Sequence, residues 1–297
     1  CILWDGEKLH GLNASGRAPA AWSPERFPDG MVEHGWDSVT VPGAVSAWVE
    51  LMEKFGKLDL ATVLAPAIRY AEEGFLVSPT IATLWARGAE VLGKQPGFAE
   101  TFLPEGRPPR AGERFRNPGA ARTLRLIAET NGRAFYEGEI AEEIVAHAKA
   151  NGGAMTMADL AANKPEWCGT ISQSFDDVEL HEIPPNGQGI AALMALGILE
   201  HSDIRAHGAD DLMAVHLQIE ACKLAYSDLH AYVADRTAMT EVDEKALLDP
   251  AYLKSRAALI STEKAQDFGA GAPKQGGTVL MSTADASGMM VSFIQSN

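Results

Sequence analysis

The residues best placed to do chemistry lie in the segment KQGGTVLMSTADASGMMVSFIQSN, where two glycines directly precede Thr278. The flanking residues predict two strands, Thr278–Ala284 and residues 289–296, joined by an Asp-Ala-Ser-Gly turn. Pairing across this turn places Thr278 opposite Gln295 or Ser296. One interpretation is an ordinary hairpin with a glycine-rich entry. The other is a hydroxyl nucleophile at the start of a strand.

The stretch before Thr278 is the only low-complexity part of the sequence. Residues 263–277, EKAQDFGAGAPKQGG, are rich in Gly and Ala and nearly lack large apolar side chains, which predicts an exposed, cleavable loop. Cutting the bond between Gly277 and Thr278 would free an α-amine that can act as base for the hydroxyl of the same residue. An α-amino pKa of about 7.7 to 8.0 in peptides suits that role. The pattern favours an N-terminal nucleophile hydrolase.

Strands are predicted at both ends of the chain, with helices between them. The opening residues CILWDGEKLHGLN read as strand, Asp-Gly turn and strand, and VPGAVSAWVELMEKFG begins a long helical region. Helix starts are indicated at Asn117 before a proline, at Thr156 three residues ahead of Asp159, and at Asp249 before a proline. Further elements are predicted in residues 178–183 (a strand), 190–200 and 211–235 (two long amphipathic helices).

Composition describes a globular, acidic chain. A length of 297 residues with 46% hydrophobic content is enough for one large or two ordinary domains. The net charge of -15, without long runs of Lys or Arg, disfavours nucleic acid and anionic membranes as partners and favours a small-molecule or peptide substrate. The longest apolar run, residues 190–199, is about half the length needed to span a bilayer, and no targeting segment is visible.

Cysteines and histidines suggest neither a disulfide framework nor a metal site. Cys1, Cys168 and Cys222 lack Cys-x-x-Cys spacing and are expected to be free thiols. The eight histidines are scattered, without the i, i+4 spacing of a helical metal pair. Free thiols fit the cytoplasm but also a periplasmic or secreted protein, so the compartment stays open.

The sequence resembles the gamma-glutamyltranspeptidases over nearly its whole length. The blocks that match the family in order are SGRAPA, VPGAVSAWVELMEKFGKLDLATVLAPAIRYAEEGFLVSP, NPGAARTLRLIAETNGRAFYEGEIAEEIVAHAKANGGAMTMADLA, PPNGQGIAAL and EACKLAYSDLHAYVAD. The resemblance implies an α+β fold, the four-layer αββα sandwich of N-terminal nucleophile hydrolases, made as a precursor that cleaves itself before a Thr. It implies that residues 1–277 belong to the large subunit and residues 278–297 begin the small catalytic subunit, within one composite domain.

The resemblance also assigns roles to individual residues. Thr278 corresponds to the nucleophile and new N-terminus, with the cleavage site between Gly277 and Thr278. Ser296 resembles the hydroxyl residue that hydrogen-bonds the nucleophile's oxygen. Arg17 in SGRAPA lies in the segment that supplies an arginine to the substrate carboxylate, a planar group that a guanidinium can bind with two hydrogen bonds. A surface-loop arginine is the alternative reading.

Departures from the family pattern bear on the substrate. The family's arginine often stands slightly earlier, at the position of Ser15; Val279 replaces a frequent second Thr; and PPNGQG replaces a more usual Ser-Ser-Gly-Gly version of that loop. These differences point to a divergent bacterial branch that includes cephalosporin acylase-like and oxamate amidohydrolase-like enzymes. The oxyanion-hole and amine-binding residues are expected beyond Asn297, and a segment upstream of Cys1 is expected to be missing.

The resemblance implies an autoprocessed amidohydrolase or acyltransferase of glutathione metabolism or related chemistry. It would cleave a γ-glutamyl-type or similar small carboxylate-bearing amide through an acyl-enzyme on Thr278, without a metal or organic cofactor. Its partners are the substrate and the two subunits of one precursor, with homo-oligomerisation left open. One alternative is an inactive, unprocessed scaffold. Another is a hydrolase using Cys168 or Ser15, although no Gly-x-Ser-x-Gly elbow or recognisable partner histidine supports it.

Overall fold

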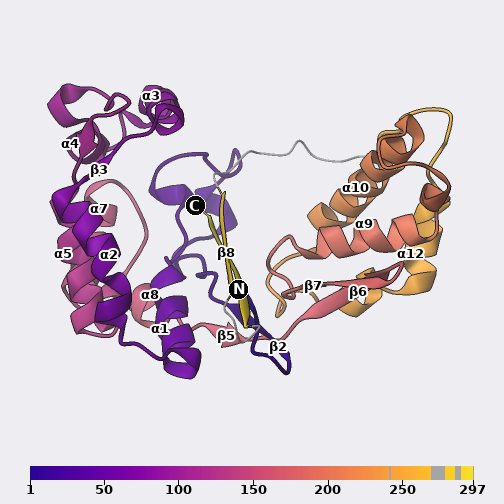
Figure 1. Cartoon of the computed structure of the whole chain (residues 1–297), viewed down its shortest axis with the longest axis horizontal. Helices are drawn as coiled ribbons and strands as arrows, with labels where there is room; N and C mark the ends of the chain where they lie inside the picture. Colours follow the sequence, from indigo (N-terminus) through magenta and orange to yellow (C-terminus); the bar gives the residue numbers. More distant parts are fainter. Residues whose placement is uncertain (241, 269–277, 285–288, 297) are drawn as a thin grey trace. The chain divides into compact units, whose positions relative to one another are not determined.

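The computed structural model describes residues 1–240, 242–268, 278–284 and 289–296, with the backbone alone for 278–284 and 292–296. The chain forms two compact units (Figure 1). Unit 1 contains Cys1–Asn13 and the chain from Glu166 onward, and unit 2 is Ala14–Pro165. These boundaries follow packing. The expected subunit boundary between Gly277 and Thr278 is a separate matter and stays a prediction.

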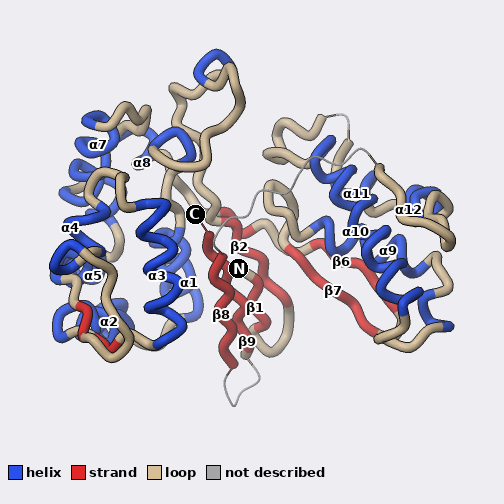
Figure 2. The backbone as a smooth tube through the Cα atoms, turned by 90° about the horizontal axis from the view of Figure 1, so that it is seen from above, coloured by secondary structure: helices blue, strands red, loops and turns tan. Residues whose placement is uncertain are grey.

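Unit 1 contains an antiparallel sheet made from both ends of the chain, in the order β5-β2-β1-β9-β8 (Figure 2). Its strands are β1 (Ile2–Trp4), β2 (Leu9–Asn13), β5 (Glu166–Trp167), β8 (Thr278–Ala284) and β9 (Met290–Ser296). Both predicted hairpins are therefore present, and β9 begins one residue later than expected. Leu3 and Leu12 bury their side chains in the core, which fixes the face that each strand presents.

The rest of unit 1 packs helices on a third hairpin, β6–β7, with α9 between α10 and the strands (Figure 1). Its elements are β6 (Ile171–Phe175), β7 (Val178–Glu182), α9 (Ile190–Glu200), a 3-10 turn (Ile204–Ala206), α10 (Leu212–Tyr232), α11 (Glu244–Leu247) and α12 (Pro250–Ala257). The prediction of an amphipathic α9 was wrong, because α9 is apolar on all sides and almost entirely buried. In contrast, α10 buries one face and exposes Leu212 and Ile219 on the other.

Unit 2 is helix-rich, as the sequence predicts. Its helices are α1 (Ala44–Phe55), α2 (Leu60–Glu73), α3 (Pro79–Leu92), α4 (Phe98–Phe102), α5 (Pro118–Glu129), α6 (Arg133–Glu137), α7 (Glu139–Ala150) and α8 (Met157–Ala161). Three 3-10 turns (Pro24–Arg26, Trp36–Ser38, Pro104–Gly106) and the short hairpin of β3 (Phe75–Leu76) and β4 (Arg114–Phe115) complete it. Its cores bring α1 and α2 together with α5 and α6, around Val45, Leu60 and Ile127.

The three predicted helix starts are confirmed by their capping hydrogen bonds. The Asn117 side chain accepts from Ala120 N at 3.0 Å, and the Asp249 side chain accepts from Tyr252 N at 2.9 Å. Thr156 and Asp159 form a reciprocal capping box at the start of α8. Each cap satisfies a backbone donor that the first helical turn leaves without a partner. Within the described residues, no helix combines the length and the apolar composition that crossing a membrane requires.

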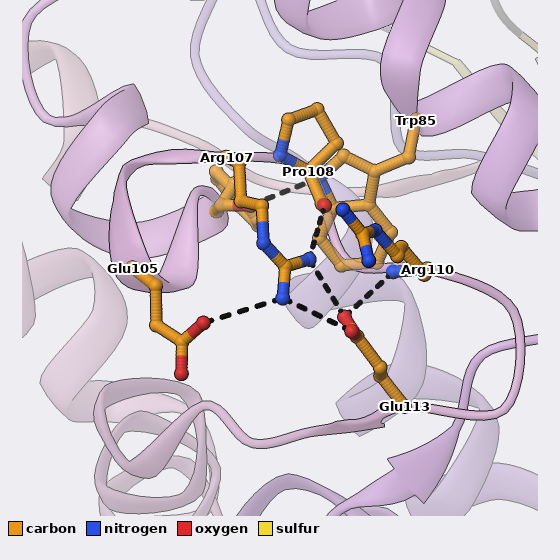
Figure 3. A network of polar contacts seen from close by, with 7 residues as sticks. Trp85, Glu105, Arg107, Pro108, Arg110 and Glu113 are labelled. Carbon is orange, nitrogen blue, oxygen red and sulfur yellow. Dashed lines mark hydrogen bonds and ion pairs between the residues drawn. The ribbon is translucent and has the colours of Figure 1, made fainter.

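An ion-pair network closes the loop between α4 and β4 (Figure 3). Arg107 donates to both carboxylate oxygens of Glu113, at 2.9 and 3.0 Å, and also to Glu105 at 3.2 Å. The same carboxylate accepts from the backbone N–H of Arg110 at 2.8 Å. These hydrogen bonds, with Arg107 as the main cause, lower the pKa of Glu113 to about 2. The network therefore fixes the loop around a carboxylate that stays charged.

Candidate active site

Thr278 is the first residue of β8, and the backbone register pairs it with Ser296 of β9. Of the two partners that the hairpin pattern allows, Gln295 pairs instead with Val279. The two hydroxyl residues singled out in the sequence are thus direct neighbours across one ladder. Gly277, on the other side of the expected cleavage point, lies outside the described residues.

The sheet fixes the position of this pair through β9. This strand is bonded to β8 on one side and to β1 on the other, where Ile2 pairs with Ser292 and Trp4 with Met290. The opening residues of the chain therefore set the register of its last strand. A strand that slips by one residue presents the opposite set of residues to each face of a sheet, and the buried Leu3 fixes the face that β1 presents.

Arg17 lies in unit 2, in an exposed loop that is held closely against the segment before α1. Its carbonyl oxygen accepts from Val41 N at 3.0 Å. A Cβ on Gly16 would lie 1.5 Å from the Val41 carbonyl oxygen, and one on Gly43 would lie 1.7 Å from the Ala14 carbonyl oxygen. Only glycine fits at either position, because the two backbones are in contact.

Two further contacts hold this loop and its neighbour. At the end of the loop, Ala20 N donates to Asp159 at 2.8 Å, and Asp159 belongs to the capping box of α8. The neighbouring segment is held by Tyr136, whose hydroxyl donates to the Pro42 carbonyl oxygen at 2.9 Å and accepts from Ser46 N at 3.0 Å. Burial raises the pKa of the Tyr136 hydroxyl. Arg17 therefore projects from a fixed backbone, although its expected approach to Thr278 stays a prediction.

The PPNGQG loop of unit 1 contains polar groups whose positions the sequence did not reveal. Asn13, the last residue of β2, donates to the Asn186 side chain at 2.9 Å. A Cβ on Gly189 would lie 2.4 Å from a carboxylate oxygen of Glu182, so the loop passes closely over this half-buried acid. Burial raises the pKa of Glu182. The divergence of the loop from the family pattern pointed to Asn186, whereas no sequence signal pointed to Asn13 or Glu182.

The rival cysteine nucleophile has the wrong surroundings. Cys168 is half-buried, and its thiol lies 3.6 Å from the Gly11 carbonyl oxygen and 3.5 Å from that of Gly169. Burial, as the main cause, raises the pKa of the Cys168 thiol, which disfavours the reactive thiolate. Ser15, the other rival, shares the exposed loop of Arg17.

Among the described residues, neither the potential metal ligands nor the hollow in unit 2 indicates an alternative reactive centre. The described residues contain no group of three or more His, Cys, Asp or Glu that could hold a metal ion. A shallow hollow of about 420 Å³ in unit 2 is lined by Pro104, Arg114, Phe115 and Arg116. Both arginines also donate to the backbone at the end of α2, Arg114 to Gly74 O at 3.1 Å and Arg116 to Glu73 O at 3.0 Å.

The loop expected before Thr278 is less loose than predicted in its described part. Residues 262–265 are exposed, but Gln266 and Phe268 are partly buried against α10. Both are held by hydrogen bonds to α10 side chains. The remainder of the predicted loop lies outside the described residues.

Comparisons with known proteins give a consistent result. The family model described as Gamma-glutamyltranspeptidase matches residues 1–297. The glutathione hydrolase-like YwrD proenzyme of Bacillus subtilis is 36% identical over 269 residues, covering 88% of this chain and 50% of that protein. The oxamate amidohydrolase proenzyme of Klebsiella pneumoniae is 38% identical over 264 residues, covering 87% of this chain and 49% of that protein.

A solved structure shares the fold. The crystal structure of cephalosporin acylase from Bacillus halodurans superposes with a TM-score of 0.90 at 42% identity, covering 99% of this chain and 55% of that one. The chain thus spans about half the length of the curated relatives it matches. The α+β class expected from the sequence is confirmed, and the fold is that of N-terminal nucleophile hydrolases. By its matched residues, its relatives and its fold, this chain belongs to the gamma-glutamyltranspeptidase family.

Proposed function

We propose that the protein is an amidohydrolase that matures by cutting its own chain between Gly277 and Thr278 and then uses Thr278 as an N-terminal nucleophile. The observation that carries the proposal is the register of the last hairpin, which puts Thr278 at the start of β8 directly opposite Ser296. Opposite residues in an antiparallel ladder have Cβ atoms about 4.5–5.5 Å apart, which suits a hydrogen bond between two hydroxyls. The word proenzyme in the names of its relatives supports maturation by cleavage.

Maturation needs no added reagent except water. The Thr278 hydroxyl oxygen attacks the Gly277 carbonyl carbon, the C–N bond breaks, and an ester to the Thr278 oxygen forms while the hydroxyl proton moves to the freed amine. Water then hydrolyses the ester, which leaves a carboxylate on Gly277 and restores the Thr278 hydroxyl. The products are a large subunit that ends at Gly277 and a small subunit that begins at Thr278.

The mature enzyme repeats this chemistry on its substrate. The α-amine of Thr278 removes the hydroxyl proton, the oxygen attacks the substrate amide carbon, and the same proton passes to the leaving amine. The acyl group is then an ester on Thr278 until water releases it as a carboxylic acid. Ser296 hydrogen-bonds the nucleophilic oxygen and orients it. No step draws on a metal or an organic cofactor.

Arg17 selects substrates that carry a carboxylate on the acyl side. A guanidinium can bind both oxygens of a carboxylate in one plane, and the glycine contacts hold its backbone in place. Oxamate and glutathione, which appear in the names of two relatives, are both amides with a carboxylate. The protein therefore acts on a small carboxylate-bearing amide, and more weakly on γ-glutamyl amides of the glutathione type.

Mass and sequence analysis of the full-length protein tests the maturation step. We expect two chains, the smaller beginning Thr-Val-Leu-Met. Thr278→Ala should give one uncut, inactive chain, while Thr278→Ser should retain some cleavage because it keeps a hydroxyl. Cleavage at the same bond in Thr278→Ala would rule out Thr278 as the nucleophile. A wild-type protein that stays uncut and inactive would support the scaffold alternative.

Acceptor competition tests which product the acyl-enzyme gives. Val279 and the PPNGQG loop lack hydroxyls that many family members have, and such groups orient polar acceptors. We therefore expect hydrolysis to dominate over transfer to an amine. With a chromogenic γ-glutamyl anilide, adding a dipeptide should leave anilide release nearly unchanged. A several-fold rise, with accumulation of the γ-glutamyl dipeptide, would instead identify a transpeptidase.

A further inference from the structure

A set of contacts outside the candidate active site attaches the chain before Thr278 to α10. The His216 ring donates from Nε2 to the Ser261 carbonyl oxygen at 2.7 Å. Three turns further along α10, the Ser227 hydroxyl donates to the Phe268 carbonyl oxygen at 3.2 Å. Residues 261–268 are thus bound to α10 at both ends. Between these ends lie two charged residues of α10, Glu220 and Lys223.

Glu220 is a fully buried carboxylate with two donors. It accepts from Lys223 Nζ at 2.7 Å through one oxygen and from Gln266 N at 3.0 Å through the other. A buried charge is expensive unless it is paired and hydrogen-bonded, and here both oxygens are satisfied. The carboxylate therefore makes the attachment of Gln266 specific, because a shift of this residue would leave one buried oxygen without a donor.

Lys223 joins the same segment from the other side. Its ammonium group donates to the Gln266 carbonyl oxygen and lies 5.4 Å from the centre of the Phe268 ring. Phe268 in turn packs against the apolar core around α9 and α10. Hydrogen bonds to charged groups are about twice as strong as neutral ones, and a cation over an aromatic ring adds further attraction. We refer to Glu220, Lys223, Gln266 and Phe268 as the α10 clamp.

From this geometry we infer that the α10 clamp positions the scissile bond for self-cleavage, a role that rests on the proposed function. Phe268 stands ten residues before Thr278 in the sequence. Ten residues reach at most about 33–36 Å, so a fixed Phe268 sets an upper limit on its distance from Thr278 and shortens the length of chain that must close between two fixed ends. The start of β8 is held by the sheet. The clamp and the sheet thus hold the two ends of the segment that contains the bond.

The clamp residues position the scissile bond and do not contact the substrate, so replacing them should slow maturation without altering the mature active site. We expect Glu220→Gln and Lys223→Met to slow cleavage of the full-length precursor about tenfold or more, measured as a time course in cell-free synthesis. Lys223→Arg should keep more of the rate than Lys223→Met, because it keeps the cation. Phe268→Ala should also slow cleavage, and it leaves every clamp charge in place.

The control is Glu200→Gln, which changes an acid of the same unit that pairs with Arg205 at 2.6 Å. It should mature at the wild-type rate. The part of each clamp variant that has matured should keep kcat/KM within about twofold of wild type. In the uncut Thr278→Ala background, the clamp variants should be cut faster by trypsin at the exposed Lys264.

Three results separate the outcomes. Wild-type maturation rates in both Lys223→Met and Phe268→Ala would overturn the inference, whether or not Glu220→Gln folds. A loss of kcat/KM in the matured variants that parallels their slower cleavage would also overturn it, since the clamp would then support the fold in general. Failure of the wild-type precursor itself to cut before Thr278 would refute the proposed function, and the clamp role with it.

Discussion

Replacing Gly16 with Ala should disable substrate recognition while leaving the chain folded. The added Cβ would lie 1.5 Å from the Val41 carbonyl oxygen and 2.5 Å from its carbonyl carbon. Side-chain Cβ atoms do not approach other atoms within 3.0 Å, so the two backbones must move apart by about 1.5 Å. The clash is with backbone, which cannot rotate away as a side chain could. The displaced segment contains Arg17, the next residue.

The size of the effect follows from that displacement. A shift of about 1 Å in a positioning element can reduce catalysis by roughly 10²-fold, or about 2.7 kcal/mol. We therefore expect kcat/KM for a carboxylate-bearing amide to fall about 10²-fold in Gly16→Ala. Overpacking of this kind costs about 1–3 kcal/mol of folding stability, which a domain of this size can tolerate. Cleavage before Thr278 should continue, because Arg17 serves the substrate.

The assay compares kcat/KM for a carboxylate-bearing amide with that for its uncharged analogue. Gly88→Ala is the matched control, since Gly88 lies in α3 of the same unit and a Cβ there would meet nothing within 4 Å. It should leave activity unchanged and stabilise α3 by up to about 1 kcal/mol. Wild-type kcat/KM in a folded Gly16→Ala protein would refute the reasoning, as would an equal loss on the uncharged analogue.

Three other predictions concern single residues. Arg17→Ala should lose roughly 2–4 kcal/mol of transition-state binding for carboxylate substrates, and Arg17→Lys should recover little, because one ammonium group cannot replace two parallel hydrogen bonds to a carboxylate. Measuring kcat/KM across a series of substrates tests both variants, and unchanged values would show that Arg17 does not bind the substrate. Cys168→Ser should mature and turn over within about twofold of wild type, whereas inactivity of a folded variant would favour the cysteine mechanism. Glu113, with its folded pKa lowered from 4.5 to about 2, should stabilise the protein fully above about pH 4.5 and progressively less as the pH falls toward 2. The stability difference between wild type and Glu113→Gln, from urea unfolding at several pH values, should shrink over that window, and a difference independent of pH would contradict the ion pair with Arg107.

Local sequence determined the features whose partners lie a few residues away. The caps at Asn117, Thr156 and Asp249 each bind a backbone N–H three residues later, so the residue types alone predict them. The length of one turn limited the partner of Thr278 to Gln295 or Ser296, and the register of the folded sheet then selected Ser296. The family resemblance could likewise be read from the order of the blocks, and the comparisons confirm it.

Tertiary structure decided the features that depend on distant segments. The near-complete burial of α9 agrees with a sequence that is apolar on all sides, but the fold alone decided that α10, α12 and β6 are the elements that cover it. The close approach of Gly16 to Val41 is set by two loops meeting, and a glycine in a sequence does not reveal which backbone it will touch. Glu220 is the first residue of the EACKLAYSDLHAYVAD block, and the sequence assigned it no role, although an acid among the apolar, buried positions of α10 indicated a paired charge. Its function as an anchor became visible only when the fold brought Gln266 onto it, because a buried charge is understood through the donors that surround it.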